Sequence, residues 1–86
     1  RVEHRRAPFT LGRSPEADLV LDDAFAKRLH AEITVDAAGN AFVIDRTSSN
    51  GTFVNGARVE RARLVRGDEI VLGTTRLIFE GVGSWT

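Results

Sequence analysis

Three separate stretches of this chain carry side chains that hold anions in proteins. Arg13 ends a short apolar segment, and Lys27 and Arg28 come just before a longer one. Ser49 and Asn50 lie in a turn that is rich in hydroxyl groups. Charge-assisted hydrogen bonds contribute roughly 1.5 to 3 kcal/mol each, so these donors would hold a phosphoryl group if the fold brought them together. Taken singly, each basic side chain is more often an ordinary solvated charge.

The hydroxyl-rich turn belongs to residues 47–56, where two Asn-Gly pairs bracket a short apolar segment. Asn and Gly accept positive φ most readily, so each pair predicts a tight reversal, with a short strand at 52–54 between them. Thr47, Ser48 and Ser49 precede the first reversal, which is more small donors than a structural hairpin needs. The pattern indicates a loop that binds a ligand.

The totals describe one soluble domain and exclude several functions. Twelve basic residues balance 12 acidic ones, which argues against bulk binding of nucleic acid or of a membrane surface. No apolar run is long enough to cross a bilayer. The absence of cysteine rules out disulfides and thiolate metal sites. Because methionine is also absent, we expect residues 1–86, with a core at about 9–80, to be a single domain within a longer protein.

An enzymatic function lacks the residues that it would need. Ser48 or Ser49 would have to act with His4 or His30, but neither serine lies in a nucleophile elbow and no carboxylate is paired with either histidine. The two histidines are 26 positions apart and match no metal-ligand spacing. The glycines form neither a dinucleotide-binding nor a Walker motif. The sequence therefore predicts a binding domain without catalysis, metal or cofactor.

Short apolar runs separated by turn residues predict an all-β fold. Leu29, Ala31, Ile33 and Val35 alternate with polar residues, which predicts a half-buried strand with these four side chains inside. No segment keeps a helical period over about ten residues, so the regular turn signals favour a β-sandwich or barrel. The expected strands are 9–13, 19–21, 29–35, 41–45, 52–54, 57–59, 63–65, 69–72 and 75–80.

Three segments have no clear apolar period. Residues 1–6 are polar and basic and predict a frayed edge strand. Residues 24–28 predict an irregular loop. Residues 81–86 form a tail, and we expect its Trp85 to fold back on the core.

Five motifs in order have the spacing of one known family. They are LGRSP at 11–15, DLVLD at 18–22, RLHAEI at 28–33, the run from 45 to 56, and GDEI with LG at 67–73. On these motifs the chain resembles the forkhead-associated (FHA) domain from Phe9 to Phe79. The resemblance implies an antiparallel β-sandwich of about eleven short strands, the first truncated here, with recognition loops at one end. It also implies a cytoplasmic signalling or regulatory domain that binds phosphothreonine in partner proteins and has no catalytic activity.

The resemblance assigns roles to individual residues. Arg13 would bond the phosphate, Ser49 would add a hydroxyl contact, and Asn50 would hold the ligand backbone. Arg28 would reach the phosphate or the peptide. Phe25 lies where the family often contacts the peptide beyond the phosphothreonine, although a lone loop aromatic serves equally as a plug under the loop. Structural support of the site would come from Gly12, His30, Gly51, Asn55 and Gly56.

Lys27 stands where the family has a phosphate-binding serine, three residues before His30. The change removes one hydroxyl donor, while an ammonium supplies a longer-reaching charge in its place. Two hypotheses follow from this departure. The first is a phosphothreonine-dependent peptide-binding domain, with Lys27 among its phosphate contacts. The second is a degenerate FHA-like domain that associates with a partner, or with itself, independently of phosphate.

Overall fold

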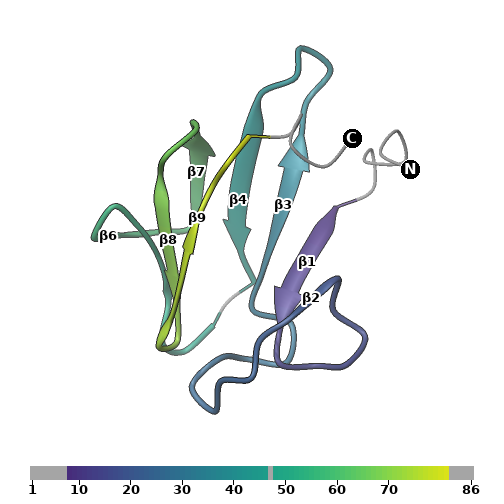
Figure 1. Cartoon of the computed structure of the whole chain (residues 1–86), viewed down its shortest axis with the longest axis vertical. Helices are drawn as coiled ribbons and strands as arrows, with labels where there is room; N and C mark the ends of the chain where they lie inside the picture. The colour runs from purple at the N-terminus through teal and green to yellow at the C-terminus, as the bar shows by residue number, and fades with distance from the viewer. Residues whose placement is uncertain (1–7, 47, 82–86) are drawn as a thin grey trace.

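The computed structural model describes residues 8–46 and 48–81, and every regular element in these ranges is a β-strand. Figure 1 shows the arrangement of the strands. No helix within the described ranges is long and apolar enough to cross a membrane. The strands are β1 (Phe9–Gly12), β2 (Leu19–Val20), β3 (Ala31–Val35), β4 (Ala41–Asp45), β5 (Thr52–Val54), β6 (Ala57–Val59), β7 (Arg61–Leu64), β8 (Glu69–Leu72) and β9 (Thr75–Ile78).

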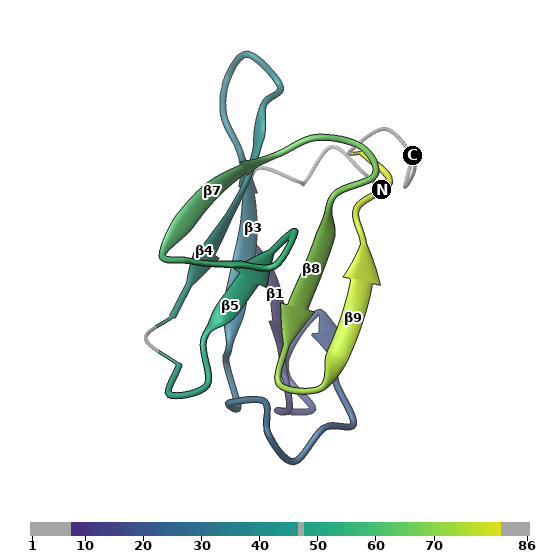
Figure 2. The same cartoon turned by 90° about the vertical axis from the view of Figure 1, so that its left-hand side faces the viewer.

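The strands form two sheets that face each other (Figures 1 and 2). One sheet has the order β2-β1-β3-β4-β7 and the other β6-β5-β8-β9. All neighbours are antiparallel except β1 and β2, which run parallel with Leu11 opposite Leu19. This confirms the expected all-β sandwich. The described ranges hold nine strands, whereas the expectations for residues 1–6 and for Trp85 lie outside them.

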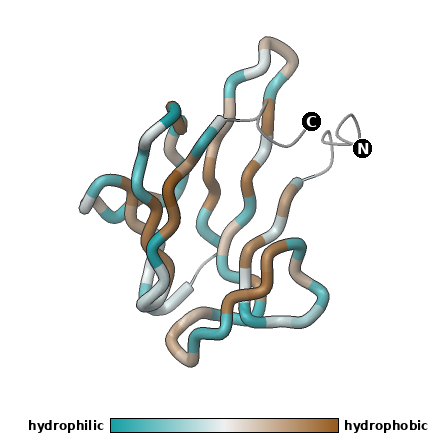
Figure 3. The backbone as a smooth tube through the Cα atoms, viewed as in Figure 1, coloured by the Kyte–Doolittle hydropathy of each residue, from teal (hydrophilic) through white to brown (hydrophobic). Residues whose placement is uncertain are grey.

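The core lies between the two sheets and follows the alternation of the strands. Figure 3 shows apolar and polar segments taking turns along the strands. Val43 of β4 at 0% and Ile70 of β8 at 1% exposure are among the most deeply buried residues. Side chains of a strand alternate between its two faces, so each strand contributes only every second residue to this core.

The start of β3 differs from the sequence prediction. Leu29 was expected inside, but its side chain is 39% exposed, while His30 is fully buried at 0%. The period-two pattern holds from Ala31 onward, where the residue-by-residue register with β1 and β4 begins. Residues 29 and 30 still belong to the preceding loop, where polar contacts decide which side chain is buried.

Strand β7 begins two residues earlier than expected. Arg61 pairs with Ile44, and its guanidinium carbon lies 4.1 Å from the centre of the Phe42 ring. A cation over an aromatic face is attracted by the ring quadrupole. This contact across strands adds to the backbone pairing of Arg61 with Ile44.

The Asn55–Gly56 pair forms the tight turn that the sequence predicts. Asn55 has φ 51° and Gly56 φ 87°, the combination of a two-residue hairpin turn between β5 and β6. The Asn55 side chain also donates to Asp68 at 3.0 Å and accepts from the backbone N–H of Glu69 at 3.0 Å. It thereby ties this turn to the turn between β7 and β8.

Two aspartates stabilise the β3–β4 and β7–β8 turns. Asp36 accepts from the backbone N–H of Asn40 at 2.9 Å, and Asp68 accepts from that of Val65 at 2.8 Å. In each case this backbone hydrogen bond is the main cause of a pKa below the ordinary value for aspartate.

Two further aspartates accept hydrogen bonds at the opposite end of the sandwich, Asp23 in the β2–β3 loop and Asp45 at the end of β4. A hydrogen bond from the Thr75 hydroxyl, with others from backbone N–H groups, outweighs burial and lowers the pKa of Asp23 to about 2. Burial acts to raise the pKa of Asp45, but hydrogen bonds from Ser48 and Thr52 outweigh it and the pKa is lowered. All four carboxylates are therefore better proton acceptors in the unfolded chain than in the folded one.

We expect the free energy of unfolding to fall as the pH is lowered from about 4 to about 2. Above the unfolded pKa the four carboxylates are charged in both states, and their hydrogen bonds stabilise the fold fully. As the pH falls through the folded values, the unfolded chain binds more protons and this contribution is lost. Urea unfolding at a series of pH values measures the effect. A midpoint that does not change in this window would contradict it, and Asp36→Asn should lessen the dependence.

Candidate functional site

Three loops meet at the same end of the sandwich. They connect β1 to β2, β2 to β3, and β4 to β5, and Figures 1 and 2 show them at the end opposite the β3–β4 turn. They carry Arg13, Lys27 with Arg28, and Ser49 with Asn50, respectively. Because β1 and β4 end where β3 and β5 begin, the topology brings together segments that are far apart in the sequence.

Backbone hydrogen bonds join the first two loops. Arg13 N–H donates to the Lys27 carbonyl at 3.0 Å, and Ser14 N–H donates to that of Arg28 at 3.0 Å. A Cβ atom on Gly12 would lie 2.1 Å from the Arg28 carbonyl oxygen, so only glycine allows this approach. The Arg13 Nε donates to the Ala26 carbonyl at 3.0 Å. A guanidinium has five donors, so this bond orients the side chain while using only one of them.

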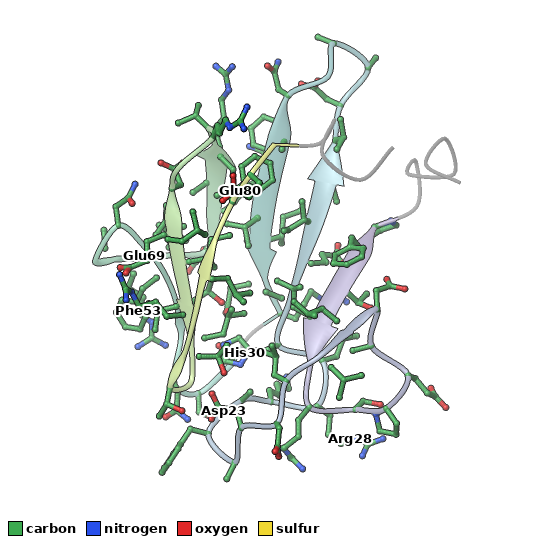
Figure 4. The ribbon with its side chains drawn as sticks, viewed as in Figure 1. Asp23, Arg28, His30, Phe53, Glu69 and Glu80 are labelled. Atoms are coloured by element: carbon green, nitrogen blue, oxygen red, sulfur yellow. The ribbon has the colours of Figure 1, made fainter. Side chains whose placement is uncertain are left out.

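His30 connects the second loop to the third. Its buried ring accepts at Nδ1 from the Lys27 backbone N–H at 3.0 Å, and Nε2 lies 2.8 Å from the Gly51 carbonyl oxygen. With Nδ1 acting as the acceptor, Nε2 carries the hydrogen and donates to Gly51. Figure 4 shows His30 in the interior above the loops. The ring therefore sets the spacing between the two loops.

Asp45, the last residue of β4, stabilises the β4–β5 loop through hydrogen bonds. Its carboxylate accepts from the hydroxyls of Ser48 at 2.6 Å and Thr52 at 2.8 Å, and the Ser48 hydroxyl in turn accepts from Gly51 N–H at 3.0 Å. Ser48 is buried and bonded inside the loop, whereas Ser49 is exposed. Of the residues at 48 and 49, Ser49 is thus the one that is accessible from outside.

Arg58 is a part of this loop that the sequence did not reveal. It comes from β6 and donates through Nη2 to the Ser49 carbonyl at 3.3 Å. Gly51 has φ 87°, and a Cβ atom there would lie 2.7 Å from the Arg58 Nε. The glycine therefore lets an arginine from a different strand pack against the loop. No local pattern marks Arg58, because the contact depends on how the two strands are paired.

An open depression of about 280 Å³ lies between the second and third loops. Asn50 crosses it and donates through Nδ2 to the Phe25 carbonyl at 2.7 Å. Lys27 borders it, and its Nζ donates to the Arg46 carbonyl at 3.0 Å. The lining residues are Ala24, Phe25, Ala26, Lys27, His30, Ser48, Ser49 and Asn50.

The structure does not bring all the expected residues to this depression. Arg13 reaches its edge through Ala26, but Arg28 is absent from the lining, and in Figure 4 its side chain points away from His30. Asn55 and Gly56 lie in the β5–β6 turn, which contacts the β7–β8 turn. The residues gathered around the depression are therefore Arg13, Lys27, Ser49 and Asn50.

Comparison with known proteins places the chain in a family. The model of the FHA domain matches residues 9–73. The chain is also similar to the glycogen accumulation regulator GarA of Mycolicibacterium smegmatis, with 44% identity over 68 residues. This match covers 79% of the chain and 42% of that protein. The chain thus spans less than half the length of this curated relative.

Solved structures agree with this match. The FhaA FHA domain, complexed with the intracellular domain of Rv3910, has a TM-score of 0.80 at 37% identity, covering 85% of this chain and 79% of that one. EmbR of Mycobacterium tuberculosis, in complex with a low affinity phosphopeptide, has a TM-score of 0.80 at 35% identity, covering 86% of this chain and 20% of that one. With this fold and the family match over most of its length, the chain belongs to the FHA domain family.

Proposed function

We propose that this domain binds phosphothreonine-containing segments of a partner protein in signalling or regulation. The observation that carries the proposal is the depression bordered by Lys27, Ser49 and Asn50, with the Arg13 guanidinium oriented at its edge. The similarity to EmbR, which is solved with a phosphopeptide, supports it. As in FHA domains generally, the proposed activity is binding without catalysis or cofactor, and it belongs to one domain with a core at about 9–80.

The depression suits a doubly charged ligand. A phosphothreonine carries about −1.5 to −2 charges at neutral pH, so it gains more than an unmodified threonine from a guanidinium, an ammonium and a hydroxyl. Arg13 and Asn50 are both held by loop carbonyls before any ligand arrives. Donors that are already oriented lose little entropy on binding, which improves affinity.

In this proposal Lys27 takes over from the family's serine as a phosphate contact. The ammonium is a three-donor group, and its Nζ donates to the Arg46 carbonyl at 3.0 Å. Its position on the rim of the depression lets the flexible stem turn toward a phosphoryl group. The same internal bond favours the second hypothesis, phosphate-independent association, if the ammonium stays with Arg46.

Titration with a phosphothreonine peptide library, beside phosphoserine and unmodified versions, tests the function directly. We expect binding to the phosphothreonine set and none measurable to the unmodified set, because the site provides mainly charge-assisted donors. Isothermal titration calorimetry of the selected peptides gives the affinities. Equal binding to modified and unmodified peptides would support phosphate-independent association instead.

We expect Arg13→Ala to weaken phosphopeptide binding at least about tenfold, because it removes a charge-assisted bond worth roughly 1.5 to 3 kcal/mol. The melting temperature should change little, since an exposed loop arginine contributes little to stability. Arg66→Ala is the matched control, because Arg66 is 79% exposed and lies in the β7–β8 turn. A large loss of stability in Arg13→Ala would show that the residue is structural.

Lys27→Ala should reduce phosphopeptide affinity by about tenfold and flatten its dependence on salt, since one cation no longer faces the phosphate. Lys27→Ser, which restores the family's residue, should keep the preference for phosphorylated peptide. Calorimetry at two salt concentrations distinguishes the variants. If Lys27→Ser binds more tightly than the natural domain, the lysine is a handicap and not a contact.

A further inference from the structure

Asp23 is a buried carboxylate within an otherwise exposed loop. Only 5% of the residue is accessible, although residues 22, 24 and 25 around it are exposed. Its Oδ2 accepts from the Thr74 backbone N–H at 2.7 Å and from the hydroxyls of Thr75 at 2.7 Å and Thr74 at 3.1 Å. Its Oδ1 accepts from Phe25 N–H at 2.9 Å. The carboxylate thus ties the β2–β3 loop to the β8–β9 turn of the other sheet.

The turn held in this way carries the carbonyl groups on which the site rests. Asp23 also accepts from Ala26 N–H through its own backbone carbonyl at 3.1 Å, which closes the turn 23–26. Within that turn, the Phe25 carbonyl holds Asn50, and the Ala26 carbonyl holds Arg13. Both of these ligand-facing side chains are therefore oriented by a segment that Asp23 fixes.

The fit around the carboxylate is close. Gly73 has φ 61°, and a Cβ atom there would lie 2.7 Å from Asp23 Oδ2 and 3.0 Å from Ala26 N. A glycine at this point lets the β8–β9 turn approach the loop directly. Figure 4 shows Asp23 among the loops, beside the lower end of the β8–β9 hairpin. The low pKa of Asp23, about 2, agrees with a carboxylate that accepts several hydrogen bonds.

We propose that Asp23, together with Thr75, is a positioning residue of the binding site. It holds the turn 23–26 against the β8–β9 hairpin and thereby sets Arg13 and Asn50 for the phosphopeptide, without touching the ligand. The proposal rests on the phosphothreonine-binding function stated above. The β6-β5-β8-β9 sheet thereby helps to position the site, although none of its strands contributes a residue proposed to contact phosphate.

Asp36 provides a matched control within the same chain. Like Asp23, it is an aspartate that accepts several hydrogen bonds in its own turn, from the N–H groups of Ala38 at 3.0 Å and Asn40 at 2.9 Å. It lies in the β3–β4 turn, at the other end of the sandwich (Figure 1). A loss of stability without a change in the site is therefore what Asp36→Asn should produce.

The test compares phosphopeptide affinities at a temperature where circular dichroism shows every variant folded. Asp23→Asn places an amide donor against the donors of the β8–β9 turn, and we expect affinity to fall about tenfold. Thr75→Val should weaken binding, and Thr75→Ser, which keeps the hydroxyl, should restore it. Asp36→Asn should bind like the natural domain. If Asp23→Asn does not fold, the comparison of Thr75→Val with Thr75→Ser tests the proposal instead.

Binding of Asp23→Asn and Thr75→Val with unchanged affinity would overturn the proposal. If the natural domain itself shows no preference for phosphorylated peptide, the proposed function fails, and NMR of the ligand-free domain then decides on the positioning role alone. The Asn50 side-chain amide and the Arg13 Nε–H resonances should shift in Asp23→Asn and stay in place in Asp36→Asn. Unshifted resonances in Asp23→Asn would overturn the role in that case too.

Discussion

The binding end of this domain depends on one buried imidazole. His30 is in contact with loops that are distant in sequence, because its ring bonds the Lys27 backbone N–H and the Gly51 carbonyl. Its backbone N–H also donates to the Leu11 carbonyl. Loop backbones make few hydrogen bonds with one another, so a side chain that hydrogen-bonds two loops fixes their separation. The ring thereby fixes the separation of the β2–β3 and β4–β5 loops, which carry Lys27, Ser49 and Asn50.

A consequence is that the site consists largely of side chains held by backbone carbonyls. Arg13 donates to the Ala26 carbonyl, Asn50 to the Phe25 carbonyl, and Lys27 to the Arg46 carbonyl. A carbonyl partner orients a donor without neutralising its charge, whereas a carboxylate partner would neutralise it. The Arg13 guanidinium therefore keeps its attraction for an anion even in a domain whose formal net charge is 0.

Features that depend on neighbouring residues could be predicted from the sequence, and features that depend on distant ones could not. The Asn55–Gly56 pair predicted its turn, and the limits of β5 (Thr52–Val54) matched, because turn chemistry is local. The inward placement of Leu29 was wrong, because the register of β3 with β1 begins at Ala31. The bond between Asp23 and Thr75 spans 52 positions, and no apolar period or turn signal marks such a contact.

The candidate site shows the same division. The motifs supplied Arg13, Lys27, Ser49 and Asn50, and the structure gathers these around one depression. They also supplied Arg28, whose direction away from His30 depends on how its loop is bonded to the first one (Figure 4). Arg58 was missed because its role follows from the pairing of β5 with β6 and not from its neighbours in sequence.

The described chain enters and leaves the domain on the side away from the three loops. Phe9, which opens β1, and Gly81 both line one apolar depression between the edges of the two sheets, and β1 runs from there toward the loops (Figures 1 and 2). Anchoring the domain at these two points would therefore leave the three loops accessible to a ligand.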